Sequence, residues 1–431
     1  MDKIRVVLPR KYDLVVGDTF QLFYRGVVEA PNPFCYDILA VCEKGKNFPR
    51  YFEYCPEEEG EHILTISVYD ADKKFLGQGK TILKVVKAEK PKVPVNILCV
   101  GDSLTTGGQW PKEAHRRLKE KGGEPTGLGF ENVSFVGSCQ KDETGFEGYG
   151  GWRWDSYLST ETAAVWIGCD VDKTEKDQHS IWKDENNNLW KLETIDDFGF
   201  IKFLKYGENT TNVPQGDYLY HHENAINQEP IFIKSKEKEN TSPFYDAQKD
   251  KIDFLSYSKR IGVDKIDAVY VLLGYNGLHT TTSTLKEFCK NIVSDAKKVV
   301  DMIYSAMPDV KVKIIGVVVP SVTGGMGANY GAVLPYCDDY GLTKFVMDLN
   351  IAYEEWAQEE KYKDFVEFIN LSGQFDTDNS MPAEEKPVNV RSKKTEIVGT
   401  NGLHPTQEGY MQIADAVFRN MVHFCRKLNE K

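Results

Sequence analysis

Residues 95–104 read Val-Asn-Ile-Leu-Cys-Val-Gly-Asp-Ser-Leu, a mostly apolar run that ends in glycine, aspartate and serine. A short apolar run bounded by turn residues is typical of a strand that is buried on both faces of a parallel sheet. Similar runs follow at 133–136, 268–273, 312–319 and 365–369. We therefore expect residues 95–100 to form the first of five strands in one sheet.

Apolar residues at helical spacing separate these strands. Steps of three and four residues predict an amphipathic helix between the third and fourth strands, and a second one after the fifth. Strands that alternate with helices predict an α/β fold with a parallel, doubly wound sheet, and five such units fit a flavodoxin-like strand order. The positions that carry the helical spacing are Leu285, Phe288, Ile292, Ala296, Val299 and Ile303, and then Tyr410, Ile413, Ala414, Val417, Met421 and Phe424.

Two further parts flank or interrupt this pattern. Residues 1–88 alternate apolar and polar positions between turn clusters, which predicts an immunoglobulin-like β-sandwich. The charged, proline-containing stretch 87–94 predicts a linker that few contacts cross, so the α/β domain should span 95–431. Residues 160–242 are polar and aromatic without a long helix, and a structureless loop of that length is improbable, so we expect a β-rich insertion there.

Composition excludes several classes of protein. The 431 residues carry 53 Lys and Arg against 65 Asp and Glu, a net charge of −12, which argues against a nucleic-acid or anionic-membrane surface. No run of 18 apolar residues and no signal-peptide pattern occurs, and the nine cysteines are never spaced C-x-x-C. These features predict a cytoplasmic protein with free thiols, or a secreted one if a signal was removed, or a virion-associated one.

Polar residues and glycines follow four of the predicted elements. Since ligands bind outside the carboxyl ends of parallel strands, these residues are expected to converge at one edge of the sheet. A hydroxyl, glycine amides, a carboxamide and an imidazole would meet there. The four blocks are Gly101-Asp102-Ser103-Leu104, Glu147-Gly148-Tyr149-Gly150-Gly151-Trp152, Gly274-Tyr275-Asn276-Gly277 and Asn401-Gly402-Leu403-His404-Pro405.

In this order, the four blocks resemble those of the SGNH (GDSL-type) serine esterase superfamily, over roughly residues 95–158 and 243–431. The resemblance implies that Ser103 is the nucleophile and His404 its general base. It also implies an oxyanion hole made by the backbone N–H groups of Ser103 and Gly151 and the side-chain amide of Asn276, with Gly150 as the alternative glycine. The accessory domain and the Gly-Gly-Trp block are similar to those of carbohydrate O-acetylesterases.

The chemistry gives these residue types their own reasons. A serine hydroxyl needs an adjacent imidazole to take its proton, and fixed donors stabilise the negative oxygen of the tetrahedral intermediate. The sequence departs from the family at two positions, where Asn401 and Gly277 stand in place of aspartates. Asn401 can still offer an oxygen to the Nδ1–H of His404, as Cys-His-Asn proteases do, or the enzyme is a Ser-His dyad.

The expected activity is removal of a small acyl group, most simply acetyl, from an oligosaccharide, a polysaccharide or a small molecule. Trp152 and Tyr275 are candidate substrate-binding residues. A lipase or thioesterase for longer acyl chains, or a degenerate fold retained for glycan binding, are the alternatives. His279 could line the pocket or replace the base. We expect no cofactor. We also expect no metal site at His221-His222-Glu223, because adjacent side chains point apart. The sequence leaves the oligomeric state open.

Overall fold

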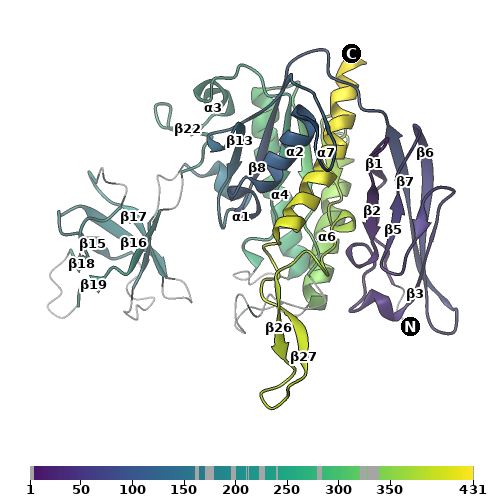
Figure 1. The fold of residues 1–431 in the computed structure, drawn as a ribbon. Helices are drawn as coiled ribbons and strands as arrows, with labels where there is room; N and C mark the ends of the chain where they lie inside the picture. Colours follow the sequence, from purple (N-terminus) through teal and green to yellow (C-terminus); the bar gives the residue numbers. More distant parts are fainter. Residues whose placement is uncertain are drawn as a thin grey trace. The chain divides into compact units, whose positions relative to one another are not determined.

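A computed structural model describes most of the chain, and its contacts group the residues into two compact units. The main unit comprises Met1–Asp155 and Phe254–Lys431, and the inserted unit comprises Ser156–Asp253. Figure 1 shows the elements of each unit in chain order. The described residues are 4–160, 165–169, 179–195, 200–209, 211, 213–222, 229–238, 241–278, 284–320, 328 and 339–430.

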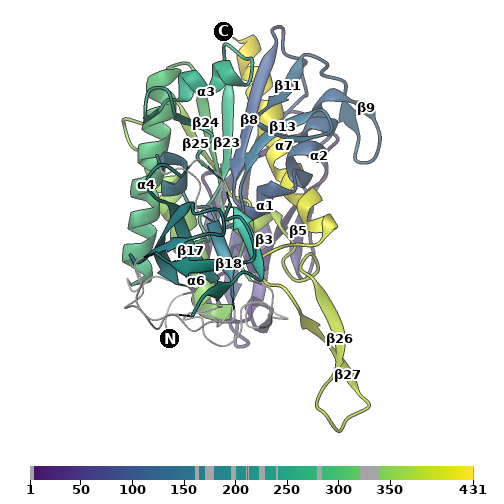
Figure 2. The ribbon, with the colours of Figure 1, turned by 90° about the vertical axis from the view of Figure 1, so that its left-hand side faces the viewer.

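The central sheet of the main unit confirms the α/β prediction with parallel strands. Strand β8 pairs in parallel with β23 on one side and with β11 and then β13 on the other, and β24 and β25 extend the sheet beyond β23. In Figure 2, β8, β23, β24 and β25 run side by side. The strands are β8 (Val95–Gly101), β11 (Val133–Val136), β13 (Thr144–Gly148), β23 (Ala268–Leu272), β24 (Lys311–Ile315) and β25 (Val366–Ile369).

Helices at the predicted positions cover this sheet. Alternate residues of β8 and β23 share one core cluster with α2 and α7. Helix α4 buries its predicted stripe from Phe288 to Ile303, and a reciprocal hydrogen-bond pair between Thr284 and Glu287 caps its start. Strand β24 ends at Ile315, earlier than predicted. The helices are α1 (Ser103–Thr106), α2 (Gln109–Lys119), α3 (Phe254–Arg260), α4 (Leu285–Ala306), α6 (Asp339–Ala357) and α7 (Gln407–Asn429).

The N-terminal part consists of two sheets around one core. The four-stranded sheet has the order β1-β7-β6-β3 and the three-stranded sheet has the order β2-β5-β4. Leu64, Ile66 and Val68 of β6 are buried in the shared core, as their alternation predicts. The strands are β1 (Lys11–Val15), β2 (Phe20–Phe23), β3 (Asp37–Val41), β4 (Lys46–Asn47), β5 (Tyr51–Tyr54), β6 (Gly60–Tyr69) and β7 (Phe75–Val86).

The expectation that few contacts cross from this part to the α/β part is wrong. Asp18, before β2, accepts hydrogen bonds from Arg117 of α2 and from Arg419 of α7. His423 of α7 donates from Nε2 to the backbone oxygen of Leu14 over 2.8 Å. The linker composition carries no information about these contacts, because the residues that make them lie far from the linker in sequence.

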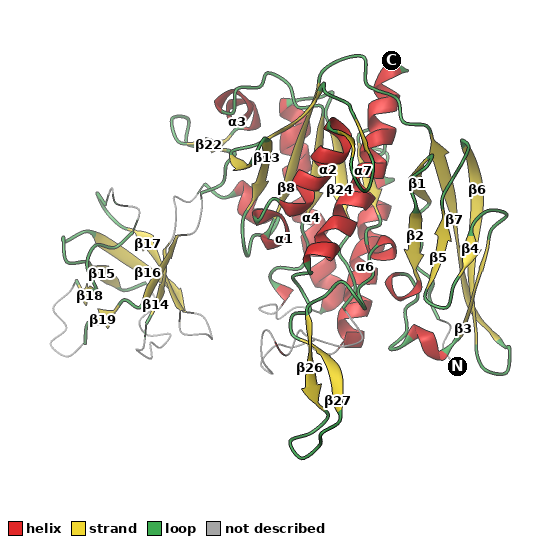
Figure 3. Cartoon of the chain, viewed as in Figure 1, coloured by secondary structure: helices red, strands yellow, loops and turns green. Residues whose placement is uncertain are grey.

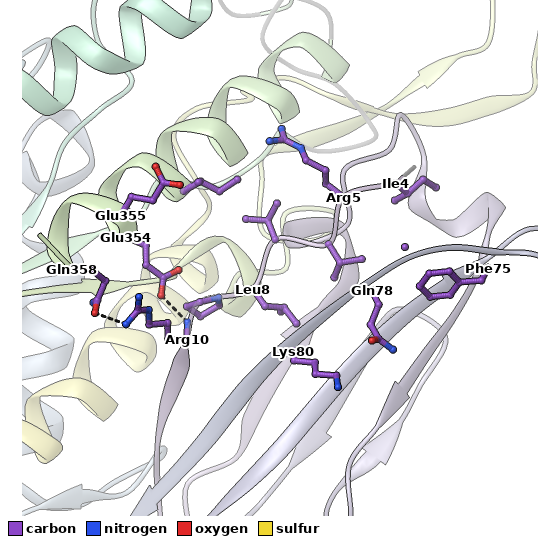
Figure 4. A pocket seen from close by; sticks show the side chains of 15 residues that line it. Ile4, Arg5, Leu8, Arg10, Phe75, Gln78, Lys80, Glu354, Glu355 and Gln358 are labelled. Carbon is purple, nitrogen blue, oxygen red and sulfur yellow. Dashed lines mark hydrogen bonds between the residues drawn. The ribbon is translucent and has the colours of Figure 1, made fainter. Parts of the chain in front are cut away.

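A second contact region joins the N-terminal part to α6. The segment 4–10 lies between β7 and α6, and a pocket of about 910 Å³ opens beside it (Figure 4). The backbone N–H of Arg10 donates to Glu354 over 2.6 Å, and its guanidinium donates to Gln358 over 2.7 Å. None of the predicted site residues lines this pocket.

The inserted unit is built from strands in its described part (Figure 3). Its seven-stranded sheet has the order β19-β18-β15-β16-β17-β14-β20 and packs around Trp182 and Trp190. Asp184 accepts from the backbone N–H groups of Asn186 and Asn188 and so forms the turn between β15 and β16. The strands are β14 (Val165–Gly168), β15 (Ile181–Lys183), β16 (Leu189–Ile195), β17 (Phe200–Lys205), β18 (Tyr218–His221), β19 (Ile231–Phe232) and β20 (Ser235–Lys238).

The other described strands are two to five residues long. The hairpin of β26 and β27 is exposed over most of its length and ends just before Asn401. No helix in the described ranges is long and apolar enough to cross a membrane. The remaining strands are β9 (Lys121–Gly122), β10 (Gly127–Leu128), β12 (Cys139–Lys141), β21 (Tyr245–Asp246), β22 (Lys251–Ile252), β26 (Ala383–Pro387) and β27 (Thr395–Gly399).

Candidate active site

Ser103 is the first residue of α1, directly beyond the carboxyl end of β8. Asp102 caps this helix, since its side chain accepts from the N–H of Leu104 over 3.0 Å. The turn requires a glycine at position 101, because a Cβ there would lie 2.1 Å from the hydroxyl of Thr105. Strand end, glycine and cap together present the Ser103 hydroxyl at the edge of the sheet.

His404 reaches Ser103 from the other end of the chain. Its Nε2 lies 2.8 Å from the Ser103 Oγ, within hydrogen-bonding distance. Partial burial lowers the pKa of His404 below its ordinary value, because desolvation disfavours the imidazolium. The ring is therefore neutral near pH 7 and can accept the proton of the hydroxyl.

Asn401 holds the loop that carries His404. Its side-chain oxygen accepts from the backbone N–H groups of Leu403 and His404, each over 2.9 Å. The expected hydrogen bond from Nδ1 of His404 to this oxygen is not among the contacts that the described residues make. This expectation is wrong for a local reason. An asparagine oxygen forms a turn with the N–H groups two and three residues ahead more readily than it reaches the ring of His404.

Two backbone N–H groups are open at this edge. In the described part of the chain, neither the N–H of Ser103 nor that of Gly151 donates a hydrogen bond. Gly151 has a φ of +77°, which a residue with a Cβ rarely adopts. The N–H of Tyr149 donates to the oxygen of Gly101 over 3.2 Å, and this bond places the second block beside the first.

The amide of Asn276 already has two acceptors. Its Nδ2 donates to the Asp102 carboxylate over 3.0 Å and to the backbone oxygen of Trp152 over 2.9 Å. An amide nitrogen carries two hydrogens, so donation to a third oxygen requires that Asn276 share one of them. Asn276 thus joins the first, second and third blocks.

Asp102 was not assigned a role from the sequence. Complete burial raises the pKa of Asp102 to about 7, because desolvation disfavours the carboxylate, although the N–H of Leu104 counteracts it. The carboxyl group of Asp102, which precedes Ser103 and contacts Asn276, is therefore present in both protonated and ionised forms near neutral pH. The one feature of the sequence that could have indicated a role for Asp102 is its position directly before Ser103 at the end of a strand.

Glu147 is a second buried carboxylate that the sequence did not single out. It accepts from the hydroxyls of Tyr149 and Tyr257, each over 2.6 Å, and from the N–H of Ser138 over 2.6 Å. Desolvation raises the pKa of Glu147 above its ordinary value, while these donors counteract it. The network fixes the start of the second block, and hence the approach to Gly151.

The two predicted substrate-binding side chains are buried. Trp152 is 4% exposed and packs against Tyr149 with ring centroids 4.2 Å apart. Tyr275 is 7% exposed, and its hydroxyl donates to the backbone oxygen of Val318. Their rings fill the core beneath the site, so this expectation is corrected: neither offers a face on which a sugar could stack. Sequence alone does not show whether an aromatic residue at a strand end points inward.

Two other candidates fall on residues that the structure does not describe. His279 and Glu223 lie outside the described ranges. Among the described residues, no three or more His, Cys, Asp and Glu side chains form a group that could hold a metal ion.

Comparisons with known proteins give structural likenesses alone. No protein-family model and no curated protein matches the sequence. The chain is similar to a family 3 carbohydrate esterase from Talaromyces cellulolyticus, with a TM-score of 0.38 and 13% identity, over 77% of this chain and 99% of the other. It is also similar to a Clostridium thermocellum family 3 carbohydrate esterase, with a TM-score of 0.37 and 14% identity, over 78% and 98% of the chains.

A third likeness extends along nearly the whole chain. It is to a Corynascus thermopiles carbohydrate esterase family 2 enzyme with its carbohydrate binding domain, with a TM-score of 0.32 and 10% identity, over 99% of each chain. All three likenesses have TM-scores below 0.5 and at most 14% identity, so they carry no argument about function.

Proposed function

We propose that the protein is a serine esterase of the SGNH type that removes a small acyl group, acetyl, from a carbohydrate. The observation that carries the esterase proposal is the 2.8 Å contact between the Ser103 Oγ and Nε2 of His404. The acetyl group and the carbohydrate follow from the resemblance of the four sequence blocks. We also propose that the strand order of the central sheet is the SGNH arrangement and that the N-terminal sheets form an accessory β-sandwich.

Deacylation would proceed in two halves. The Ser103 Oγ attacks the ester carbonyl carbon while its proton passes to Nε2 of His404. The carbonyl oxygen becomes an oxyanion, and the open N–H groups of Ser103 and Gly151 are available to stabilise it. His404 then returns the proton to the leaving alcohol oxygen, which leaves an acyl group on Ser103.

The second half restores the enzyme. His404 takes a proton from water, the resulting hydroxide attacks the acyl carbon, and a second oxyanion forms in the same place. Its collapse breaks the bond to the Ser103 Oγ, which regains its proton from His404. The carboxylic acid, acetic acid for an acetyl ester, is the second product.

The test is hydrolysis of p-nitrophenyl acetate by Ser103→Ala. We expect activity to fall to background while the circular-dichroism spectrum is unchanged, because the variant loses a single hydroxyl. Thr106→Ala, which removes another hydroxyl from the same short helix, is the matched control and should keep its activity. Activity of Ser103→Ala equal to that of the unmodified protein would refute the nucleophile.

Two further measurements separate the alternatives. A lipase or thioesterase would hydrolyse long p-nitrophenyl esters faster than the acetate, whereas the proposed enzyme prefers the acetate. Mass-spectrometric detection of acetate released from acetylated glycans tests the substrate class. Glycan binding without release of acetate or of p-nitrophenol would indicate a degenerate hydrolase.

A further inference from the structure

The inserted unit exposes a cluster of aromatic rings, which we call the ring patch: Tyr218, Tyr220 and Phe232. They are 40%, 38% and 44% exposed, respectively. The residues between and beside them in sequence, Leu219 and Ile231, are fully buried in the core of the unit. Because side chains alternate along a strand, the three rings share the face of the sheet opposite to that core.

The register of the sheet makes the patch continuous. Tyr218 on β18 lies directly opposite Phe232 on the neighbouring strand β19, and their ring centroids are 5.3 Å apart. Tyr220 lies two residues further along β18, with its centroid 6.3 Å from that of Tyr218. Figure 1 shows the two strands side by side within the inserted unit.

The chemistry of this surface is selective. All four large hydrophobic side chains exposed in the described part of the inserted unit are aromatic, namely the ring patch and Tyr206, whereas those exposed in the main unit are mostly aliphatic. Isolated exposed apolar residues are common on protein surfaces, but adjacent ones mark an interaction site. The face of an aromatic ring is electronegative, so it attracts the slightly positive C–H groups that line the faces of a sugar ring.

Charge argues against the other stacking ligand, a nucleic acid. Residues 156–253 contain 19 Asp and Glu against 11 Lys and no Arg. Single-stranded nucleic acids are bound where aromatic rings lie in a positively charged groove, and an acidic unit would repel their phosphates. A neutral chain of sugars meets no such repulsion. Lys183, which lies opposite Tyr220 on β15, offers a hydrogen-bond donor for sugar hydroxyls.

We propose that the ring patch of the inserted unit is a binding site for a neutral glycan chain. The ring patch belongs to the inserted unit and Ser103 to the main unit, and glycan binding to the patch does not depend on Ser103 being a nucleophile. Sugar rings would stack on Tyr218, Tyr220 and Phe232, and their hydroxyl groups would remain hydrated or bond to Lys183.

Affinity electrophoresis tests this site in the full chain. The protein carries Ser103→Ala throughout, so that binding is measured without turnover. Native gels contain acetylated xylan, glucomannan or hydroxyethyl cellulose as probes. We expect retardation by at least one of them, and we expect Tyr218→Ala/Tyr220→Ala/Phe232→Ala to weaken it by about tenfold or more in apparent dissociation constant.

Matched variants complete the test. Tyr206→Ala removes an equally exposed ring directly after the last residue of β17, three strands away from β18 in the sheet, and this variant should bind as before. In the background with Ser103 intact, the triple variant should hydrolyse p-nitrophenyl acetate at the unmodified rate, which separates this site from the esterase. No retardation by any of the three polysaccharides would overturn the proposal, as would equal retardation of the triple variant. A concentration-dependent dimer that the triple variant loses, without glycan retardation, would assign the patch to self-association instead.

Discussion

The side-chain amide of Asn276 donates to the carboxylate of Asp102 over 3.0 Å, although the two residues are 174 positions apart in sequence. Asp102 directly precedes the nucleophile that we propose, and Asn276 also donates to the backbone oxygen of Trp152. One carboxamide therefore connects the loops after β8, β13 and β23. Any change at Asn276 acts on the geometry of the site as well as on its supply of donors.

Asn276→Ala should lower both stability and turnover. Loss of the amide leaves the buried Asp102 and the oxygen of Trp152 without this donor, so the free energy of unfolding should fall by about 1–3 kcal/mol. If Asn276 shares one amide hydrogen with the oxyanion, kcat on p-nitrophenyl acetate should fall by about 10², the usual effect of losing one oxyanion donor, with KM little changed. Urea unfolding and steady-state kinetics measure the two effects. An unchanged kcat would show that Asn276 only connects the loops.

Asp102 should make the protein less stable as pH rises. Its pKa is raised to about 7 by burial, against an ordinary value of 3.8, so the folded state binds more protons than the unfolded state between these values. The stabilisation of the folded state by the proton on Asp102 is complete below about pH 4 and is lost as pH rises through 7. From pH 5 to pH 8, the free energy of unfolding should fall by about 2–3 kcal/mol relative to Asp102→Asn, whose side chain does not titrate.

The comparison with Asp102→Asn is needed because other groups titrate in both proteins. Their contributions cancel in the difference between the two free energies of unfolding, which urea titrations at each pH provide. A difference that stays constant between pH 5 and pH 8 would contradict the raised pKa of Asp102.

Gly151→Ala should slow turnover where Gly150→Ala does not. A Cβ at either position meets no atom within 4 Å, but Gly151 alone of the two has a positive φ, of +77°. Relief of the strain, about 1–2 kcal/mol, would rotate the peptide and move its N–H, so we expect about a tenfold lower kcat. Equal effects of the two substitutions on p-nitrophenyl acetate turnover would remove Gly151 from the oxyanion hole.

Asn401→Asp should shift the pH profile of kcat/KM. A carboxylate oxygen can keep the hydrogen bonds from Leu403 and His404, so the loop should stay folded. The new negative charge favours the imidazolium and raises the pKa of His404, which moves the acid limb to higher pH. Because its oxygens stay with the backbone, kcat above this limb should change little.

Asn389→Asp is the control for Asn401→Asp. Asn389 forms the same kind of turn, by accepting from the N–H of Arg391, but it lies in the exposed connection between β26 and β27. This variant should leave the pH profile unchanged. A large increase in kcat for Asn401→Asp would show instead that the new carboxylate reaches Nδ1 of His404 and completes a triad.

Asp18→Ala should strongly destabilise the main unit. Burial alone would raise the pKa of Asp18, but Arg419 and Arg117 lower it below the ordinary value, so the group is ionised and paired. Its removal leaves the two arginines, 2% and 7% exposed, without this partner, a change that commonly costs 3–5 kcal/mol. Asp37→Ala, which breaks the exposed pair with Lys73, should cost about 1 kcal/mol or less. Urea unfolding of both variants measures the contrast.

The sequence predicted the parts of the fold that depend on local patterns. The apolar run before Gly101 and the helical spacing from Phe288 to Ile303 both produce the expected elements, because burial on one or two faces leaves a periodic signature. The structure also brings the Ser103 and His404 side chains together, as the four blocks suggested.

Hydrogen-bond partners, side-chain orientations and long-range ion pairs cannot be predicted from the pattern of apolar and polar residues. The side-chain oxygen of Asn401 accepts from backbone N–H groups and not from the ring of His404, because the turn brings those N–H groups to it. The ring of Trp152 turns inward rather than outward. The pairing of Asp18 with Arg117 and Arg419 joins residues 99 and 401 positions apart, and charged residues are ordinarily assigned to the surface.

The hydrogen bond from His423 to Leu14 spans 409 positions and sets an order of events during synthesis. The ribosome adds about 5–20 residues per second, so Leu14 would emerge roughly 20–80 s before its partner. Until then, the face of β1 that will receive α7 stays open. The first part of the chain to be translated thus completes its packing among the last, and translation speed becomes a variable in how much protein reaches the folded state.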